Sequence, residues 1–168
     1  MIETHRLILK PLTYQQMLKY IKNDHSLEAE LKLNNSSMLI SPLLKEALEQ
    51  SILPSLQDEN KNYLFSTLWT VIDKNENISV ADVCFQGEPN QQGEIEIGYG
   101  TYEKYQGKGY MTEAVKGMLE WAAKQVKVKA IIATTDKTNV SSYAILKKNA
   151  FIKVSESKEQ FNWHFDAS

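Results

Sequence analysis

The most informative segment of this chain is YQGKGYMTEA, residues 105–114. It stands between a stretch that alternates charged and bulky residues, as strands do, and an amphipathic helical pattern that continues to Ala122. Gly107 and Gly109 expose backbone N–H groups, and the helix start adds unpaired N–H donors at the positive end of the helix dipole. The segment therefore predicts an anion site suited to phosphate. A glycine turn that merely begins a helix would show the same local pattern.

Strands are predicted both before and after the helices, on both sides of this segment. Strands are predicted over residues 7–10, 63–72, 78–85, 94–99, 130–134, 151–154 and 161–165. Helices are predicted to begin after Thr13, after Ser41 and at Asn139, and Pro54 is expected to end or kink the second of them. Because no linker or repeat divides the chain, we expect one mixed α+β domain over residues 1–168.

The composition is that of an ordinary globular protein. The 168 residues are 42% hydrophobic and carry a net charge of −2, which gives no electrostatic reason to expect nucleic acid or an anionic membrane as a partner. Arg6 is the only arginine, so phosphate binding would fall to lysine or to backbone N–H groups. Cys84 is the only cysteine and cannot form an internal disulfide. Without a signal peptide or a membrane-spanning run, we expect a soluble cytoplasmic protein.

Residues 106–111 resemble the acetyl-CoA motif of the GNAT superfamily of N-acetyltransferases. In that motif a Gln or Arg is followed by two variable residues, a Gly, another variable residue and a Gly or Ala. Gln106 and Gly109 match its first and fourth positions, whereas Met111 replaces the final small residue. The motif implies that the predicted phosphate site holds the pyrophosphate of acetyl-CoA.

Three further matches resemble the GNAT branch that contains the ribosomal-protein N-terminal acetyltransferases. They are THRLILKPL (residues 4–12), YMTEA (residues 110–114) and NVSS (residues 139–142), the last followed by Leu146, Lys148 and Phe151. Ala150 stands where that branch has a glycine. The matches occur in the right order and cover nearly the whole chain, so the resemblance implies a single GNAT domain.

The resemblance also implies the architecture and the place of the cofactor. A GNAT domain is a three-layer α/β structure with a mixed, mostly antiparallel sheet and helices on both faces. The sheet splays after the fourth strand, residues 94–101 here, and pantetheine lies in the gap and pairs with the strand edge. The residues implied in acetyl-CoA binding are Gly98, Tyr99, Gly100, Thr101, Gln106, Gly107, Lys108, Gly109, Tyr110, Met111, Thr112, Asn139, Ser142 and Lys148.

Catalytic roles are implied for two residues. Ser142 would donate a proton to the leaving thiolate, because Leu146 occupies the position where many GNAT enzymes have a tyrosine acid. Asn139 would contact pantetheine, although Asn and Ser are also favoured as helix caps. Glu96 is the first choice as general base, because an inward carboxylate on a covered sheet face is costly without a purpose. Glu96 could instead be solvated at the strand edge.

Other side chains remain open alternatives at the acceptor side. Asp24 and His25 could shape the site for the amine. Cys84 could in principle carry an acetyl group, but a strand cysteine is more often a small core residue. No metal is expected, and because dimers are common among GNAT proteins the resemblance allows a homodimer.

The function expected is acetyl transfer from acetyl-CoA to a primary amine by direct attack in a ternary complex. The acceptor would be a protein N-terminus or a small-molecule amine, and residues 24–62 would shape its site. The alternative is a non-catalytic acyl-CoA-binding module that regulates a partner. A weaker alternative is a nucleotide-binding protein that uses the same glycine loop.

Overall fold

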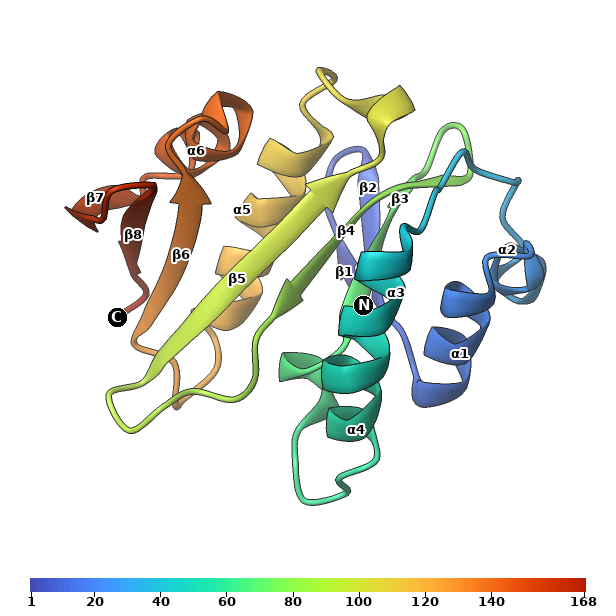
Figure 1. The fold of residues 1–168 in the computed structure, drawn as a ribbon, viewed down its shortest axis with the longest axis horizontal. Coiled ribbons are helices and arrows are strands. Elements are labelled where there is room, and N and C mark those ends of the chain that lie inside the picture. Colours follow the sequence, from blue (N-terminus) through green and yellow to red (C-terminus); the bar gives the residue numbers. More distant parts are fainter.

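The computed structural model describes all 168 residues, which form one eight-stranded sheet with helices on both faces (Figure 1). The strand order is β1-β2-β3-β4-β5-β6-β8-β7. The strands are β1 Ile2–Glu3, β2 Leu7–Pro11, β3 Leu68–Asp73, β4 Ile78–Phe85, β5 Glu94–Thr101, β6 Ala130–Asp136, β7 Ile152–Glu156 and β8 Gln160–Asp166. The main helices are α1 Tyr14–Lys22, α2 Ser26–Leu31, α3 Pro42–Ala47, α4 Leu53–Leu56, α5 Tyr110–Ala122 and α6 Val140–Lys148.

The sheet opens between β5 and β6, the one parallel pair among its strands. These strands pair only over Glu94–Glu96 and Ala130–Ile132. Beyond that point β5 pairs with β4 alone, so the edge of β5 that faces β6 is free over residues 97–101. The expected splay is therefore confirmed. It follows the fifth strand because residues 2–3 add a short strand at the sheet edge.

Neighbouring residues on β4 point to opposite faces of the sheet and serve different layers. Val83 packs in the main core with Met118 of α5. Asp82 and Cys84 face the other layer, where Tyr20 of α1 is buried. Figure 1 shows α5 on the face of the sheet opposite to α1 and α3. None of the helices has the length and apolar character needed to cross a membrane.

The predicted strand over 63–72 begins later than expected. Tyr63–Phe65 forms a 3-10 turn, and β3 starts at Leu68. The Asn62 side chain accepts the Leu64 N–H at 3.1 Å, and the Leu64 carbonyl accepts the Trp69 indole N–H at 3.0 Å. These local hydrogen bonds override the strand preference of the aromatic residues.

Pro54 does not end the helix that begins after Ser41. A π-helical stretch, Leu48–Ile52, precedes the proline, and the helix continues as α4 to Leu56. The wider turn changes the hydrogen-bond register just before the residue that lacks an N–H. Helix α1 begins as expected, with Thr13 and Gln16 forming a capping box.

Helix α6 ends in a Schellman motif with alanine at the left-handed position. The Phe151 N–H reaches the Leu146 carbonyl at 3.1 Å, and the Ala150 N–H reaches the Lys147 carbonyl at 3.1 Å. Ala150 has φ +64°, a conformation that glycine adopts without steric penalty. Ala150 is therefore a strained residue at a position that favours glycine.

Replacing Ala150 with glycine is expected to stabilise the protein. Relief of left-handed strain is worth about 1–2 kcal/mol, and the greater freedom of glycine in the unfolded chain offsets about 0.4–1 kcal/mol of it. We expect a net gain of about 0.5–1 kcal/mol in the free energy of unfolding, measured by urea titration. An unchanged or lower value would contradict the strain at Ala150, and Ala123→Gly, at the right-handed cap of α5, should destabilise instead.

Candidate active site

The turn between β5 and α5 presents a row of free backbone donors. Gly107 and Gly109 both have φ +76°, and Gly109 directly precedes the helix. The N–H groups of Gly107 and of residues 109–112 have no acceptor within the chain. A side chain at Gly107 would meet no atom within 4 Å, so this side of the turn is open. The arrangement fits a pyrophosphate, because several free N–H groups lie in consecutive residues at a helix N-terminus.

The side chains of this turn offer fewer groups for binding a phosphate than its backbone does. Lys108 is exposed, with its ammonium 5.9 Å from the centre of the Tyr105 ring. Gln106 donates back to the Thr101 carbonyl at 3.2 Å, which ties the turn to the end of β5. Met111, the departure from the GNAT motif, is 3% exposed and packs in the main core. The turn therefore accommodates methionine there by directing it inward.

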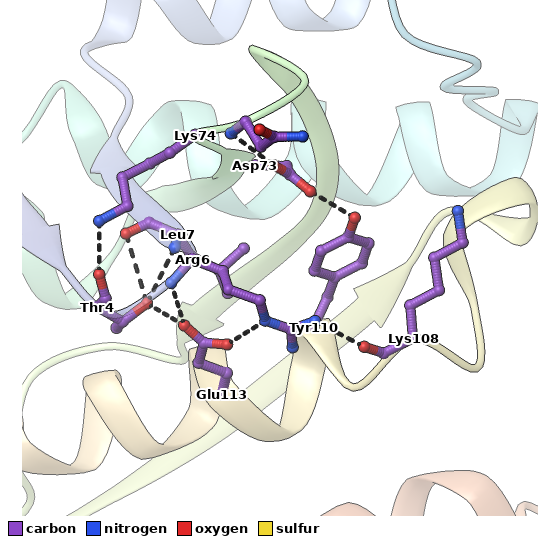
Figure 2. A network of polar contacts seen from close by, with 9 residues as sticks. Thr4, Arg6, Leu7, Asp73, Lys74, Lys108, Tyr110 and Glu113 are labelled. Carbon is purple, nitrogen blue, oxygen red and sulfur yellow. Dashed lines mark hydrogen bonds and ion pairs between the residues drawn. The ribbon is translucent and has the colours of Figure 1, made fainter.

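Arg6 and Glu113 form a hydrogen-bond network that attaches this turn to the N-terminal segment (Figure 2). Glu113 Oε2 accepts the Arg6 Nε–H at 2.7 Å, and Glu113 Oε1 accepts the Arg6 backbone N–H and the Thr4 hydroxyl, each at 2.7 Å. Arg6 Nη1 then donates to the Lys108 carbonyl at 3.0 Å. The sole arginine thus fixes a carbonyl inside the phosphate turn, while the backbone N–H groups of the turn remain free.

A second contact fixes the first turn of α5. The Tyr110 hydroxyl donates to Asp73 Oδ2 at 2.5 Å (Figure 2). Asp73 Oδ1 accepts the N–H groups of Asn75 and Glu76. Arg6 lies over the Tyr110 ring, 5.1 Å from its centre. The helix start is therefore attached both to the N-terminal strand region and to the β3–β4 turn.

Ser142 and Tyr99 meet across the splay. The Tyr99 hydroxyl donates to the Ser142 carbonyl at 3.0 Å, and the Ser142 hydroxyl lies 3.3 Å from the Tyr99 oxygen. Burial raises the pKa of Tyr99, and the hydrogen bond with Ser142 opposes that rise. Asn139 caps α6 by accepting the Ser142 N–H at 3.2 Å, so its amide NH₂ remains free to donate. Lys148 is exposed in the last turn of α6.

A cavity of about 520 Å³ lies between β4, β5 and the segments from α1 to α3. Gly98 and Gly100 form part of its β5 wall, and a side chain at Gly100 would meet no atom within 4 Å. Its remaining lining residues are Tyr20, Ser37, Leu39, Leu44, Leu68, Asp82, Val83, Cys84, Tyr99, Thr101, Tyr102 and Glu103. The cavity thus adjoins the part of β5 that lacks a partner strand.

Asp82 is the buried charge of this cavity. The residue is 9% exposed, and its Oδ2 accepts the Tyr20 hydroxyl at 2.5 Å and the Tyr102 hydroxyl at 2.8 Å. Its other oxygen, Oδ1, is buried without a partner. Burial raises the pKa of Asp82 to about 6, against the lowering effect of the two tyrosine hydrogen bonds.

The residues proposed from the sequence as base, as acceptor-site residues and as possible nucleophile lie in different places. Glu96 is half-buried at the last β5–β6 pair, on the cavity side of the sheet but outside the cavity lining. Asp24 and His25 also lie outside that lining, and α1 contributes Tyr20 instead. Cys84 lines the cavity, where burial and then Asp82 raise its pKa to about 11, which disfavours a thiolate nucleophile.

Two features of the site were missed from the sequence. Asp82 is the one charged residue in the strand ISVADVCF (residues 78–85), whose other residues are apolar except Ser79, and that charge was the available signal. The Arg6–Glu113 pair joins positions 107 residues apart, and only the uniqueness of the arginine pointed to it. No group of three His, Cys, Asp or Glu residues is placed to hold a metal ion.

Comparison with known proteins gives a family. The acetyltransferase (GNAT) domain model matches residues 6–152. The N-acetyltransferase YjdG of Bacillus subtilis (strain 168), itself uncharacterized, is 28% identical over 163 residues, covering 97% of this chain and 96% of YjdG.

Solved structures share the fold at low sequence identity. The ribosomal-protein-S5-alanine acetyltransferase of Vibrio fischeri superposes with a TM-score of 0.68 at 21% identity, covering 98% of this chain and 95% of that one. Spermidine N-acetyltransferase of Vibrio cholerae, solved with CoA and spermine, gives 0.67 at 12% identity, covering 98% and 97%. With the domain match over most of the chain, these findings show that the protein belongs to the GNAT family of N-acetyltransferases.

Proposed function

We propose that this protein transfers acetyl from acetyl-CoA to a primary amine by direct attack while both substrates are bound. The observation that carries the proposal is the row of free N–H groups at Gly107 and residues 109–112 beside the unpaired edge of β5. The turn would hold the pyrophosphate, and the β5 edge would pair with pantetheine. Asn139 and Ser142 would close the other side of the cleft, and Lys148 would lie toward the 3′-phosphate.

Acetyl transfer requires a neutral amine and groups that accept the two protons lost by the substrate ammonium. A primary ammonium group loses one proton, and its nitrogen then bonds to the acetyl carbon as the carbon–sulfur bond breaks. CoA leaves as a thiol after receiving a proton, for which Ser142 is the proposed donor. The acetylated nitrogen then loses its second proton, which restores the Ser142 hydroxyl, and the proton taken up by the base is released to solvent. Glu96 is the base proposed from the sequence. Ser142 is held by its two hydrogen bonds with Tyr99 across the splay.

The alternative of a non-catalytic acyl-CoA-binding module keeps the same phosphate turn but lacks turnover. The cavity favours the enzyme, because a module that only senses CoA does not need an acceptor site beside β5. Release of free thiol from acetyl-CoA on addition of an amine separates the two functions. Stabilisation by ATP instead of CoA would support a nucleotide-binding protein.

Acetyl-CoA should bind with measurable heat in calorimetry at near-physiological salt, and Gly107→Val should weaken that binding at least tenfold. The valine adds a side chain on the open side of the turn and strains a residue with φ +76°. Gly87→Val is the matched control, since Gly87 also has positive φ and open space but lies outside the turn. Equal binding by both variants, or no binding by the natural protein, would refute the proposed site.

A further inference from the structure

Asp82 presents an acceptor atom that the protein itself leaves unpaired. Its Oδ1 is buried and has no hydrogen-bond donor, whereas Oδ2 accepts two tyrosine hydroxyls. A buried acceptor without a donor is unfavourable, and a bound ligand with N–H groups would relieve that cost. Asp82 lies opposite Gly100 in the β4–β5 pairing, so no side chain on β5 covers it from that position.

We propose that Asp82 binds the acceptor amine and takes its proton, and that the surrounding cavity selects a primary amine with one positive charge and a compact apolar group. This inference rests on the proposed acetyl transfer, and names the base and the acceptor class of that site. An ammonium group supplies both the charge and the donors that Oδ1 lacks. Transfer of one proton from nitrogen to Oδ1 leaves a neutral amine and a neutral carboxyl group, and the proton later passes to solvent.

The environment of Asp82 favours proton uptake. Burial raises its pKa to about 6, so the carboxylate is ionised at neutral pH but holds a proton more readily than an exposed aspartate. Tyr20 from α1, Tyr102 after β5 and Cys84 on β4 surround it, and burial raises the pKa of each, which keeps all three neutral. Glu103 is the other acid that lines the cavity, and no basic residue lines it.

The rest of the cavity is suited to a small apolar body. Leu39, Leu44 and Leu68 line it. A polyamine would bring several positive charges into a site with two acids, of which only Asp82 is buried, and would leave the remaining charge against leucine side chains. A single ammonium group on an apolar body matches both parts of the lining.

The acceptor class is tested with three amines at saturating acetyl-CoA. We expect kcat/KM for 2-phenylethylamine to exceed the values for spermidine and for an alanine-initiated hexapeptide at least tenfold. Preference for spermidine or the peptide would overturn the assignment of the acceptor class. Acetyl-CoA binding is measured in parallel: if no CoA binds and no amine releases thiol, the proposed function itself fails.

The role of Asp82 is tested by substitution with pH profiles. In the natural enzyme we expect activity to fall as pH drops through about 6, where Asp82 becomes protonated. Asp82→Asn should lower kcat/KM at least 100-fold and abolish this acid limb of the pH profile. Asp166→Asn, at an exposed site at the end of β8, is the matched control and should keep both the rate and the profile. Retained activity in Asp82→Asn, or loss of the acid limb in Glu96→Gln alone, would assign the base elsewhere.

A second variant tests the same role if Asp82→Asn does not fold. Tyr20→Phe removes a hydrogen bond that favours the ionised carboxylate, so the pKa of Asp82 should rise. The acid limb of kcat/KM should then move to a pH above that of the natural enzyme. An unmoved limb would show that Asp82 does not set it.

Discussion

Glu113→Ala is expected to lower the free energy of unfolding by about 2–3 kcal/mol and to weaken acetyl-CoA binding about tenfold. Three donors converge on the Glu113 carboxylate: the Thr4 hydroxyl, the Arg6 N–H and the Arg6 guanidinium. Hydrogen bonds to charged groups contribute about 1.5–3 kcal/mol, and the 41% exposure of the Arg6 side chain reduces the ion pair's share. The melting temperature should fall by roughly 5–10 °C.

The binding effect follows from the connection between Glu113 and the phosphate turn. Glu113 orients Arg6, and Arg6 holds the Lys108 carbonyl. Without Glu113 the arginine is free to rotate, and the turn loses the contact that keeps its N–H groups aligned. Preorganised donors bind an anion more tightly than donors that must first be ordered.

The loss of stability in Glu113→Ala should also depend on pH. Burial alone would raise the pKa of Glu113, but hydrogen bonds from Arg6 and Thr4 outweigh it and hold that pKa below its usual value. The stabilisation is therefore complete above the usual glutamate pKa of about 4.3 and is lost as pH falls through the lower folded-state value. Urea titrations of the two proteins should converge in acid.

Glu120→Ala on the same helix is the matched control. Glu120 is exposed and makes no ion pair or side-chain hydrogen bond, so its removal should change stability by less than about 0.5 kcal/mol. If Glu113→Ala behaved like this control, the Arg6 network would have no role in holding the turn. If stability fell but acetyl-CoA binding did not, the network would be structural only.

Local patterns explain how much of the fold could be predicted. The capping residue Thr13, the strand over residues 78–85 and the helix that follows Asn139 each depend on neighbours within a few positions, and the structure confirms them. The start of β3 was predicted wrongly, because Asn62 caps a turn inside an apparent strand. Pro54 was expected to end or kink its helix. The helix continues to Leu56, with an irregular π-helical stretch just before the proline.

The candidate site likewise has one part that could be predicted from the sequence and one part that could not. The glycine turn is readable because its donors belong to consecutive residues. The environment of Asp82 is not, because Tyr20 is 62 positions away and Tyr102 is 20 positions away. A single acid in an apolar strand indicates only that something must compensate for its burial. The compensating groups are identified by the fold, which brings α1 and the end of β5 to the same carboxylate.

Asp82→Asn is expected to have a higher free energy of unfolding than the natural protein at neutral pH. We expect this difference between the two proteins to grow by about 3 kcal/mol as pH rises from 4 to 7. The pKa of Asp82 is about 6 in the folded protein, against 3.8 as its ordinary value. Between these values the folded state binds more protons than the unfolded state, so the natural protein loses stability as pH increases. Above about pH 6 the penalty is complete, and two pKa units correspond to about 3 kcal/mol. Asparagine has nearly the same shape, can still accept the tyrosine hydroxyls and carries no charge.

Urea titrations of both proteins at pH 4, 5, 6 and 7 measure this difference. The control is Asp166→Asn. Hydrogen bonds from the Ser168 hydroxyl and N–H lower the pKa of exposed Asp166. The difference in free energy of unfolding between this variant and the natural protein should therefore change little with pH, and in the opposite direction. Parallel stability curves for Asp82→Asn and the natural protein would mean that burial does not raise the Asp82 pKa. A variant that gains stability at neutral pH while losing activity would show that the protein retains a destabilising carboxylate for function, as expected when a buried charge serves a substrate.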